Sequence, residues 1–255
     1  MNGNSLLRIR DLVDNPTPRV PICLCLDTSA SMDAVEGECT PTGQTVFKDG
    51  KTWNVVTGGN TRIDELQKGI DQFYDSIRKD DIAVYSAEIS IVTFNSSAQC
   101  VMDFANIDRQ SEVPKLVASG DTAMGEGVNL ALDLLETRKK EYKDKGVDYY
   151  QPWLVLMTDG TPNGSKAELD RAAARISKLV LANKLTVFPI AIGNESDMSS
   201  LARLSPNTPP IKLQGLRFSE FFQWLSQSVS ATSQYLPGEK IILNYEKDIQ
   251  GWGSL

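Results

Sequence analysis

The chain has 255 residues, of which 41% are hydrophobic and 23% are charged, a balance typical of a globular protein and not of a disordered one. Its formal net charge of −7 at pH 7 argues against nucleic acid and anionic membranes as partners, because both attract basic surfaces. The chain contains no histidine, which excludes Ser-His-Asp and Cys-His catalysis and argues against a zinc site.

The length suits one large domain with short appendages. We expect residues 1–17 to be an N-terminal lead-in, residues 18–235 to form the domain and residues 236–255 to be a C-terminal tail. The apolar runs are too short to cross a bilayer, and the N-terminus lacks the apolar core of a signal peptide. A cytoplasmic location is therefore expected.

The four cysteines fit a reduced compartment. Cys23 and Cys25 lie two apart on one predicted strand, so they are expected to behave as small buried hydrophobes and not to form a bridge. Cys39 is expected in a loop and Cys100 on a strand.

The first predicted strand ends in a set of oxygen donors. Residues 22–26 are short, apolar and uninterrupted, as in a central parallel strand that is covered on both faces. Asp27, Ser29 and Ser31 follow at alternate positions, where one carboxylate and two hydroxyls can turn toward one point. Hard oxygen ligands of this kind suit Mg²⁺, Mn²⁺ or Ca²⁺. Three oxygens do not fill an octahedron, so other parts of the chain must contribute.

An insertion, residues 34–60, interrupts the expected short step from this loop to a helix. Within it, residues 44–56 predict a β-hairpin with a two-residue Asp-Gly turn. The insertion is expected to lie over the metal face, where Glu36 and Glu38 approach the ion or the hairpin shapes the choice of partner. Trp53 is either an anchor for a partner or an ordinary cross-strand packing residue.

The rest of the chain alternates between strands and helices. Strands are predicted at residues 87–94, 99–104, 153–158, 185–192 and 211–213, and helices at residues 63–77, 124–141, 166–183 and 218–230. This order predicts an α/β fold: a doubly wound, mostly parallel, Rossmann-like sheet with helices on both faces. An antiparallel hairpin at residues 88–104 places one reversed strand at an edge.

Two later stretches offer the missing ligands. Residues 153–158 form an apolar strand that ends at Asp159, and Thr122 lies in a Gly-rich loop that runs into a helix. Ligands of open parallel sheets bind beyond the carboxyl ends of the strands, so Asp27, Thr122 and Asp159 are expected to meet in one crevice. Each of these residues alone is explained by a cap or a turn, but together they favour a metal site.

Neighbouring residues have simpler explanations. Asp121 either supports the site from behind Thr122 or lies in a solvated loop. Glu126 complements the dipole at a helix start, and Asn163 with Gly164 is expected to form a turn. In the tail, Trp252 belongs either to an arm packed along the domain or to a segment that docks onto a partner.

Five residues in a fixed order carry a resemblance to a known family: Asp27, Ser29, Ser31, Thr122 and Asp159. Their order and spacing resemble the metal-ion-dependent adhesion site (MIDAS) of von Willebrand factor A domains, and the likeness covers roughly residues 18–235. The loop at residues 122–127 and the run at residues 187–193 are more closely similar to bacterial A-domain proteins of the TerY/YegL type. That type is linked to tellurium resistance and stress.

The resemblance implies a metal-dependent protein–protein binding module and not an enzyme. Ser29, Ser31 and Thr122 are then expected to bind the ion directly. Asp27 and Asp159 would act directly or through water, and their charges balance a divalent cation, Mg²⁺ first and Mn²⁺ or Ca²⁺ as alternatives. One coordination position stays open for an Asp or Glu of a partner. The TerY likeness also implies a PP2C-like phosphatase and a protein kinase as partners in a stress or defence system.

Two other functions compete with this one. A Mg²⁺-dependent phosphatase of the haloacid-dehalogenase type also has a strand that ends in Asp. That family requires an acid where Ser29 stands and a positioned lysine, for which Lys166 is a poor candidate. Alternatively, the chain is an A-domain scaffold whose metal site the insertion occludes.

Overall fold

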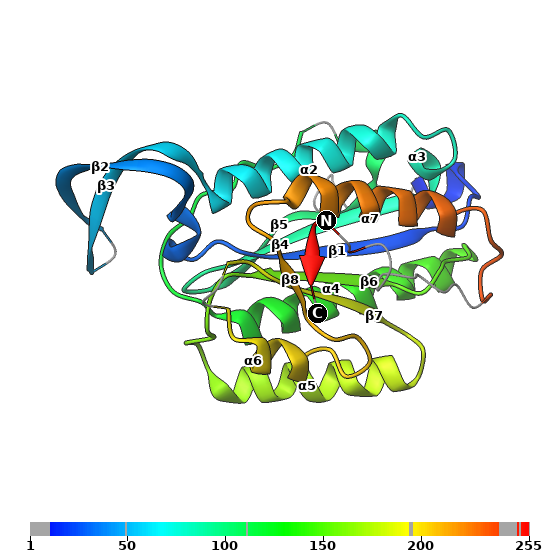
Figure 1. The fold of residues 1–255 in the computed structure, drawn as a ribbon. Helices are drawn as coiled ribbons and strands as arrows, with labels where there is room; N and C mark the ends of the chain where they lie inside the picture. Colours follow the sequence, from blue (N-terminus) through cyan, green and yellow to red (C-terminus); the bar gives the residue numbers. More distant parts are fainter. Residues whose placement is uncertain are drawn as a thin grey trace.

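The strand β1 (Val20–Asp27) is an interior strand of the sheet, with neighbours on both sides. The structure is a computed structural model, and it describes residues 11–48, 50–110, 112–193, 196–239, 249 and 251–254. A central sheet separates two layers of helices, and a two-stranded ribbon projects from one end of the molecule (Figure 1).

In the part of the chain that the structure describes, seven strands form one sheet. Their order is β5 (Ala98–Asn106), β4 (Ala87–Phe94), β1, β6 (Trp153–Thr158), β7 (Thr186–Ala191), β8 (Ile211–Leu213) and β9 (Gly253–Ser254). β1 pairs in parallel with both β4 and β6, and β5 is the antiparallel edge strand that the sequence predicts. The predicted doubly wound, mostly parallel sheet is therefore confirmed, with β9 as a second antiparallel edge.

Helices cover both faces of this sheet. One face carries α2 (Arg62–Arg78) and α7 (Phe218–Thr232), and the other carries α4 (Met124–Lys145), α5 (Lys166–Leu181) and α6 (Met198–Arg203) (Figure 1). Short connections are formed by α3 (Ala83–Ser86) and by the 3₁₀ turns η1 (Ala30–Asp33) and η2 (Ile107–Arg109). Within the described residues, no helix is long and apolar enough to span a membrane.

Alternate residues of β1 point to opposite helical layers, as the period of a strand requires. Ile22 and Leu24 belong to the apolar core beneath α2 and α7, whereas Cys23 and Cys25 belong to the core beneath α4 and α5. Both cysteines are fully buried, which confirms that they behave as small hydrophobes. Cys39 lies on a strand and not in a loop as predicted, and it is exposed.

The insertion is a longer ribbon than the predicted hairpin. Its first strand, β2 (Val35–Lys48), begins one residue after η1, and its second, β3 (Lys51–Thr61), ends directly before α2. Two irregularities in the pairing of the strands, next to glycines and a proline, hid the full length of the ribbon from the apolar pattern. Asp49 of the predicted turn lies outside the described residues.

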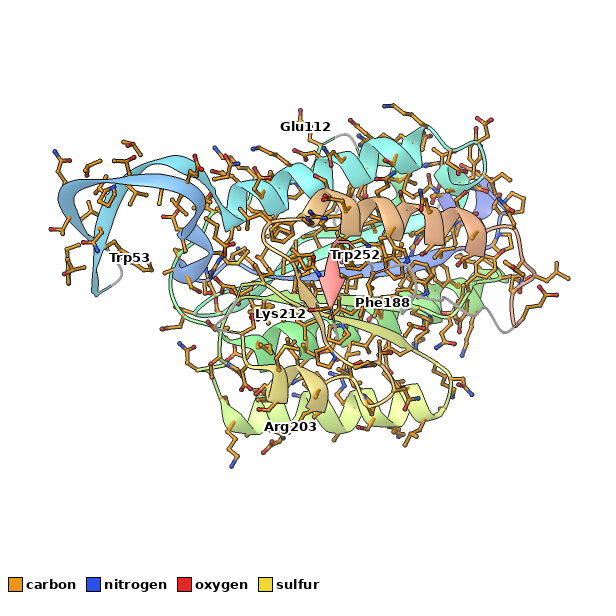
Figure 2. All side chains as sticks on the ribbon, in the orientation of Figure 1. Trp53, Glu112, Phe188, Arg203, Lys212 and Trp252 are labelled. Carbon is orange, nitrogen blue, oxygen red and sulfur yellow. The ribbon has the colours of Figure 1, made fainter. Side chains whose placement is uncertain are left out.

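The two tryptophans whose roles were left open differ in their surroundings (Figure 2). Trp53 lies on the ribbon, half-buried and opposite Val46, as in ordinary cross-strand packing. Trp252 is only 5% exposed, and its ring lies 5.4 Å from that of Phe221 and 5.8 Å from that of Trp224. Trp252 is thus part of the core, and its alternative role as an exposed docking residue is wrong.

Candidate metal centre

The carboxyl ends of β1 and β6 bring two buried acids to one edge of the sheet. The two strands are parallel neighbours, so Asp27 at the end of β1 and Asp159 directly after β6 emerge side by side. Their exposed fractions are 0% and 1%. Two carboxylates removed from water in this way repel each other, which makes the position attractive to a cation.

Hydrogen bonds hold the Asp27 carboxylate in place. Its Oδ1 accepts the backbone N–H of Ser29 at 2.8 Å, and its Oδ2 accepts the hydroxyl of Thr158 at 2.5 Å. Burial and the nearby charge of Asp159 raise the pKa of Asp27 to about 7, although the hydrogen bonds from Ser29 and Thr158 act in the opposite direction. The charged form of this carboxylate is therefore destabilised when no positive charge lies beside it.

A chain of hydroxyl groups leads from the first loop to the second acid. The Ser29 and Ser31 Oγ atoms are 3.0 Å apart, and the Ser31 hydroxyl donates to Asp159 Oδ1 at 2.7 Å. Because the Ser31 proton points to Asp159, the Ser29 hydroxyl is the donor within the serine pair. Ser29 is buried and Ser31 is half-buried at the start of η1. These two hydroxyls and both acids thus form one connected group.

Backbone hydrogen bonds dock the Thr122 loop against the first loop. The N–H of Ser119 donates to the carbonyl of Thr28 at 2.8 Å, and the N–H of Ala30 donates to the carbonyl of Gly120 at 3.0 Å. The side-chain oxygen of Asn163 accepts the N–H of Thr122 at 2.7 Å. Asn163 therefore positions the Thr122 loop, beyond the simple turn that the sequence predicts.

The third loop leaves open the space that the hydroxyls face. A Cβ at Gly160 would lie 3.5 Å from Thr122 Oγ1 and 4.0 Å from Ser31 Oγ, so both hydroxyls approach the same spot beside this glycine. The backbone N–H of Gly160 donates to Thr158 Oγ1 at 3.3 Å. The five predicted site residues therefore lie at the end of β1 and on three neighbouring loops.

Of the supporting residues, Asp121 is exposed, but its side chain contacts two other loops. Its carboxylate accepts hydrogen bonds from Ser96 at 3.4 Å and from Asn163 at 3.3 Å, so it supports the same Asn163 that positions the Thr122 loop. Glu126 lies half-buried in the first turn of α4, where its charge complements the helix dipole.

Arg62, the first residue of α2, also contacts the site, although the sequence pattern does not predict it. Its Nη1 donates to Asp159 Oδ2 at 2.7 Å, and its Nε donates to Glu36 Oε1 at 2.7 Å. Burial lowers the pKa of Arg62, but its bonds to Asp159 and Glu36 outweigh this effect and hold the guanidinium charged. Glu36 approaches the site only through Arg62, and Glu38 is exposed. The one signal in the sequence is that this arginine closely follows the insertion, which is expected to end at residue 60.

The donor set fits a hard divalent cation. It consists of two carboxylates and three hydroxyls, the oxygen ligands that Mg²⁺, Mn²⁺ and Ca²⁺ prefer. Within the residues that the structure describes, no three acidic or cysteine side chains gather into a metal cluster. An ion bound at this position would therefore take much of its coordination from hydroxyls.

Solved structures share the fold at low sequence identity. A von Willebrand factor type A protein from Catenulispora acidiphila is 16% identical with a TM-score of 0.56, over 84% of this chain and 43% of that one. The PilB minor pilin from Streptococcus sanguinis is 15% identical with a TM-score of 0.58, over 88% and 64%. Proximal thread matrix protein 1 from the mussel byssus, with a zinc-occupied MIDAS motif, is 14% identical with a TM-score of 0.50, over 85% and 49%.

This chain thus spans 43% to 64% of the length of these three proteins. A comparison with curated protein sequences finds no significant match. The family model of the von Willebrand factor type A domain matches residues 22–214, more than half of the chain. The chain therefore belongs to the von Willebrand factor type A domain family.

Proposed function

We propose that this domain is a protein-binding module that works through a divalent cation. The observation that supports it best is the meeting of two buried carboxylates with three hydroxyls at the carboxyl edge of the sheet. The proposed ligands are those of a MIDAS: Asp27, Ser29, Ser31, Thr122 and Asp159. Mg²⁺ is the proposed ion, with Mn²⁺ and Ca²⁺ as alternatives.

Each part of the site has a separate task. Ser29, Ser31 and Thr122 offer neutral oxygens, which leave most of the positive charge of the ion uncompensated. Asp27 and Asp159 supply the negative charge, directly or through water. When bound, the ion offers an open coordination position to an Asp or Glu of a protein partner.

The structural relatives support this at the level of the fold. One of them carries a zinc-occupied MIDAS motif, and others are a minor pilin and the pilus adhesin SpaC from Lactobacillus rhamnosus GG. A cytoplasmic role in tellurium resistance, stress or defence, together with a PP2C-like phosphatase and a kinase, rests on the TerY-like loop at residues 122–127. That pathway is a finer proposal than the binding function itself.

The phosphatase alternative finds less support at this site. Ser29 stands where that chemistry needs an acid, and its hydroxyl is engaged with Ser31. Lys166 is exposed at the start of α5, whereas Asp27 and Asp159 are buried. The occluded scaffold is favoured by a specific observation, the contact of Arg62 with Asp159.

The test measures ion binding and partner capture together. Titration calorimetry with Mn²⁺ should detect a single site in the wild type, and Asp27→Ala should weaken it at least about tenfold. A pull-down from a lysate of the source organism should retain a partner with Mg²⁺ and lose it with EDTA or with Asp27→Ala.

The exposed acid Asp81 provides the control, and Asp81→Ala should behave as the wild type in both assays. Retention of the same partner by Asp27→Ala in EDTA would refute the proposal.

A further inference from the structure

The insertion returns to the domain at an arginine that contacts the proposed metal centre. The backbone N–H of Arg62 donates to the carbonyl of Ala34 at 3.1 Å, which closes the base of the ribbon. The side chain of the same residue bridges Glu36 at the start of β2 and Asp159 beside the hydroxyls. One residue thus connects the ribbon with the site.

The guanidinium holds one of the two oxygens of a buried carboxylate. Ser31 donates to Asp159 Oδ1, and Arg62 donates to Asp159 Oδ2. The Arg62 side chain is 12% exposed and that of Asp159 is fully buried, so solvent screens their attraction weakly. Removing one member of such a pair leaves a buried charge without a partner, unless another cation replaces it.

The surroundings leave the guanidinium little freedom. A Cβ at Gly193, two residues beyond β7, would lie only 2.7 Å from Arg62 Nη2 and 3.4 Å from Glu36 Oε1. These distances show that the backbone at Gly193 packs closely against the ion pair, and its φ of +70° also favours glycine. Arg62 is therefore seated in a fitted position and does not extend into solvent.

We propose that Arg62 is a built-in competitor of the metal ion that couples the site to the inserted ribbon. Without the ion, the guanidinium neutralises Asp159 and holds the start of β2 against the domain through its bond to Glu36. A divalent cation that takes over the charge of Asp159 displaces Arg62, releases Glu36 and loosens the ribbon. The inference rests on the proposed function, because it takes the ion site as given.

Linkage makes this coupling reciprocal. If the ion loosens the ribbon, a partner that binds the loosened ribbon raises the affinity for the ion by the same factor. The hydrogen bonds of Arg62 and Glu36 would thus act as a latch on the proposed adhesion site.

The first test is Mn²⁺ titration of the full chain by calorimetry. Arg62→Gln should bind Mn²⁺ about tenfold more tightly than the wild type, a typical size for a coupling between two sites. Glu36→Gln should have an intermediate effect, because Arg62 then retains Asp159 alone. Lys68→Gln removes one positive charge from the same helix, where Lys68 is 57% exposed and paired with Glu65, and should leave the affinity unchanged.

The second test follows amide hydrogen exchange of β2 and β3 by mass spectrometry. Saturating Mn²⁺ should speed exchange at the base of the ribbon in the wild type and in Lys68→Gln. In Arg62→Gln the same amides should exchange fast without Mn²⁺ and respond little to it. Circular dichroism and thermal melting of each variant establish that it is folded.

The outcomes separate this inference from the proposed function. Equal Mn²⁺ affinity of the wild type and Arg62→Gln, or a ribbon whose exchange ignores Mn²⁺, would overturn the inference and leave the metal site standing. Absence of Mn²⁺ binding in both proteins would overturn the proposed function and the inference with it. Mn²⁺ binding by Arg62→Gln and not by the wild type would support the inference, because Arg62 would then exclude the ion from the site.

Discussion

Asp27 is the residue at which function and stability conflict. Burial and the charge of Asp159 raise its pKa from 3.8 to about 7. The folded chain therefore holds this proton more tightly than the unfolded chain does. Protonation of Asp27 therefore stabilises the folded state. This contribution to the free energy of unfolding is fully present below pH 3.8 and is lost as the pH rises through 7. An ion bound beside Asp27 would offset the cost of burying its negative charge at neutral pH.

We predict that Asp27→Asn stabilises the ion-free protein at pH 8 but hardly at pH 4, because the amide carries no charge to be buried. The gain in the free energy of unfolding between these pH values should be on the order of 4 kcal/mol. Urea unfolding in EDTA at both pH values measures it. Asp81→Asn, at an exposed acid, should show no such dependence. A gain for Asp27→Asn that is equal at both pH values would contradict the prediction.

At the scale of elements, the start of α4 shows why the Thr122 loop is rich in glycine. A Cβ at Gly125 would lie 2.4 Å from the backbone nitrogen of Leu169 in α5. The obstacle is backbone and cannot rotate away, so only glycine allows α4 and α5 to approach this closely. The glycine therefore serves helix packing, and through it the position of the loop that carries Thr122.

We predict that Gly125→Ala lowers the free energy of unfolding by about 1–3 kcal/mol, because the helices must separate to admit the methyl group. It should also weaken Mn²⁺ binding, since α4 begins two residues after Thr122. Glu136→Ala, on the exposed side of α4, should change stability by less than about 0.5 kcal/mol. Thermal unfolding of both variants measures the difference. Equal stability of the two would contradict the prediction and show that α5 moves aside at no cost in unfolding free energy.

At the scale of the whole molecule, a buried ionic network stabilises the end of the sheet opposite the metal centre. Glu88, in the second position of β4, is fully buried. Its carboxylate accepts from Arg19 Nε at 2.9 Å, from Arg138 Nε and Nη2 at 2.7 and 2.9 Å, and from the Tyr142 hydroxyl at 2.6 Å. The network joins β4 and α4 to the segment before β1.

We predict that Glu88→Gln costs about 3–5 kcal/mol of unfolding free energy, because it removes the buried carboxylate charge that two buried guanidinium groups share. Asp133→Asn removes a charge of the same sign from a pair with Arg175, in which Asp133 is 59% exposed, and should cost less than about 1 kcal/mol. Urea unfolding compares the two. Similar losses in both variants would show that burial does not decide the strength of these pairs.

Much of the molecule follows from local pattern. Short apolar runs predict β1, β6 and β7, and apolar residues at helical spacing predict α2 and α7, because burial on both faces or on one face leaves a period in the sequence. The candidate site was predictable for a related reason. Asp27 and Asp159 directly follow strands, and the ends of neighbouring parallel strands meet at one edge whatever the loops do.

The sequence by itself thus determined the sheet, its helical layers and the residues offered to an ion. The tertiary structure decided which distant groups meet them: Arg62 on Asp159, Asn163 on the Thr122 loop, Trp252 in the core and Glu88 between two arginines. These contacts leave no local period, since each joins residues far apart in the chain. They depend on the paths of the loops and on the pairing of buried charges. Both are set only when the chain folds and brings these groups together.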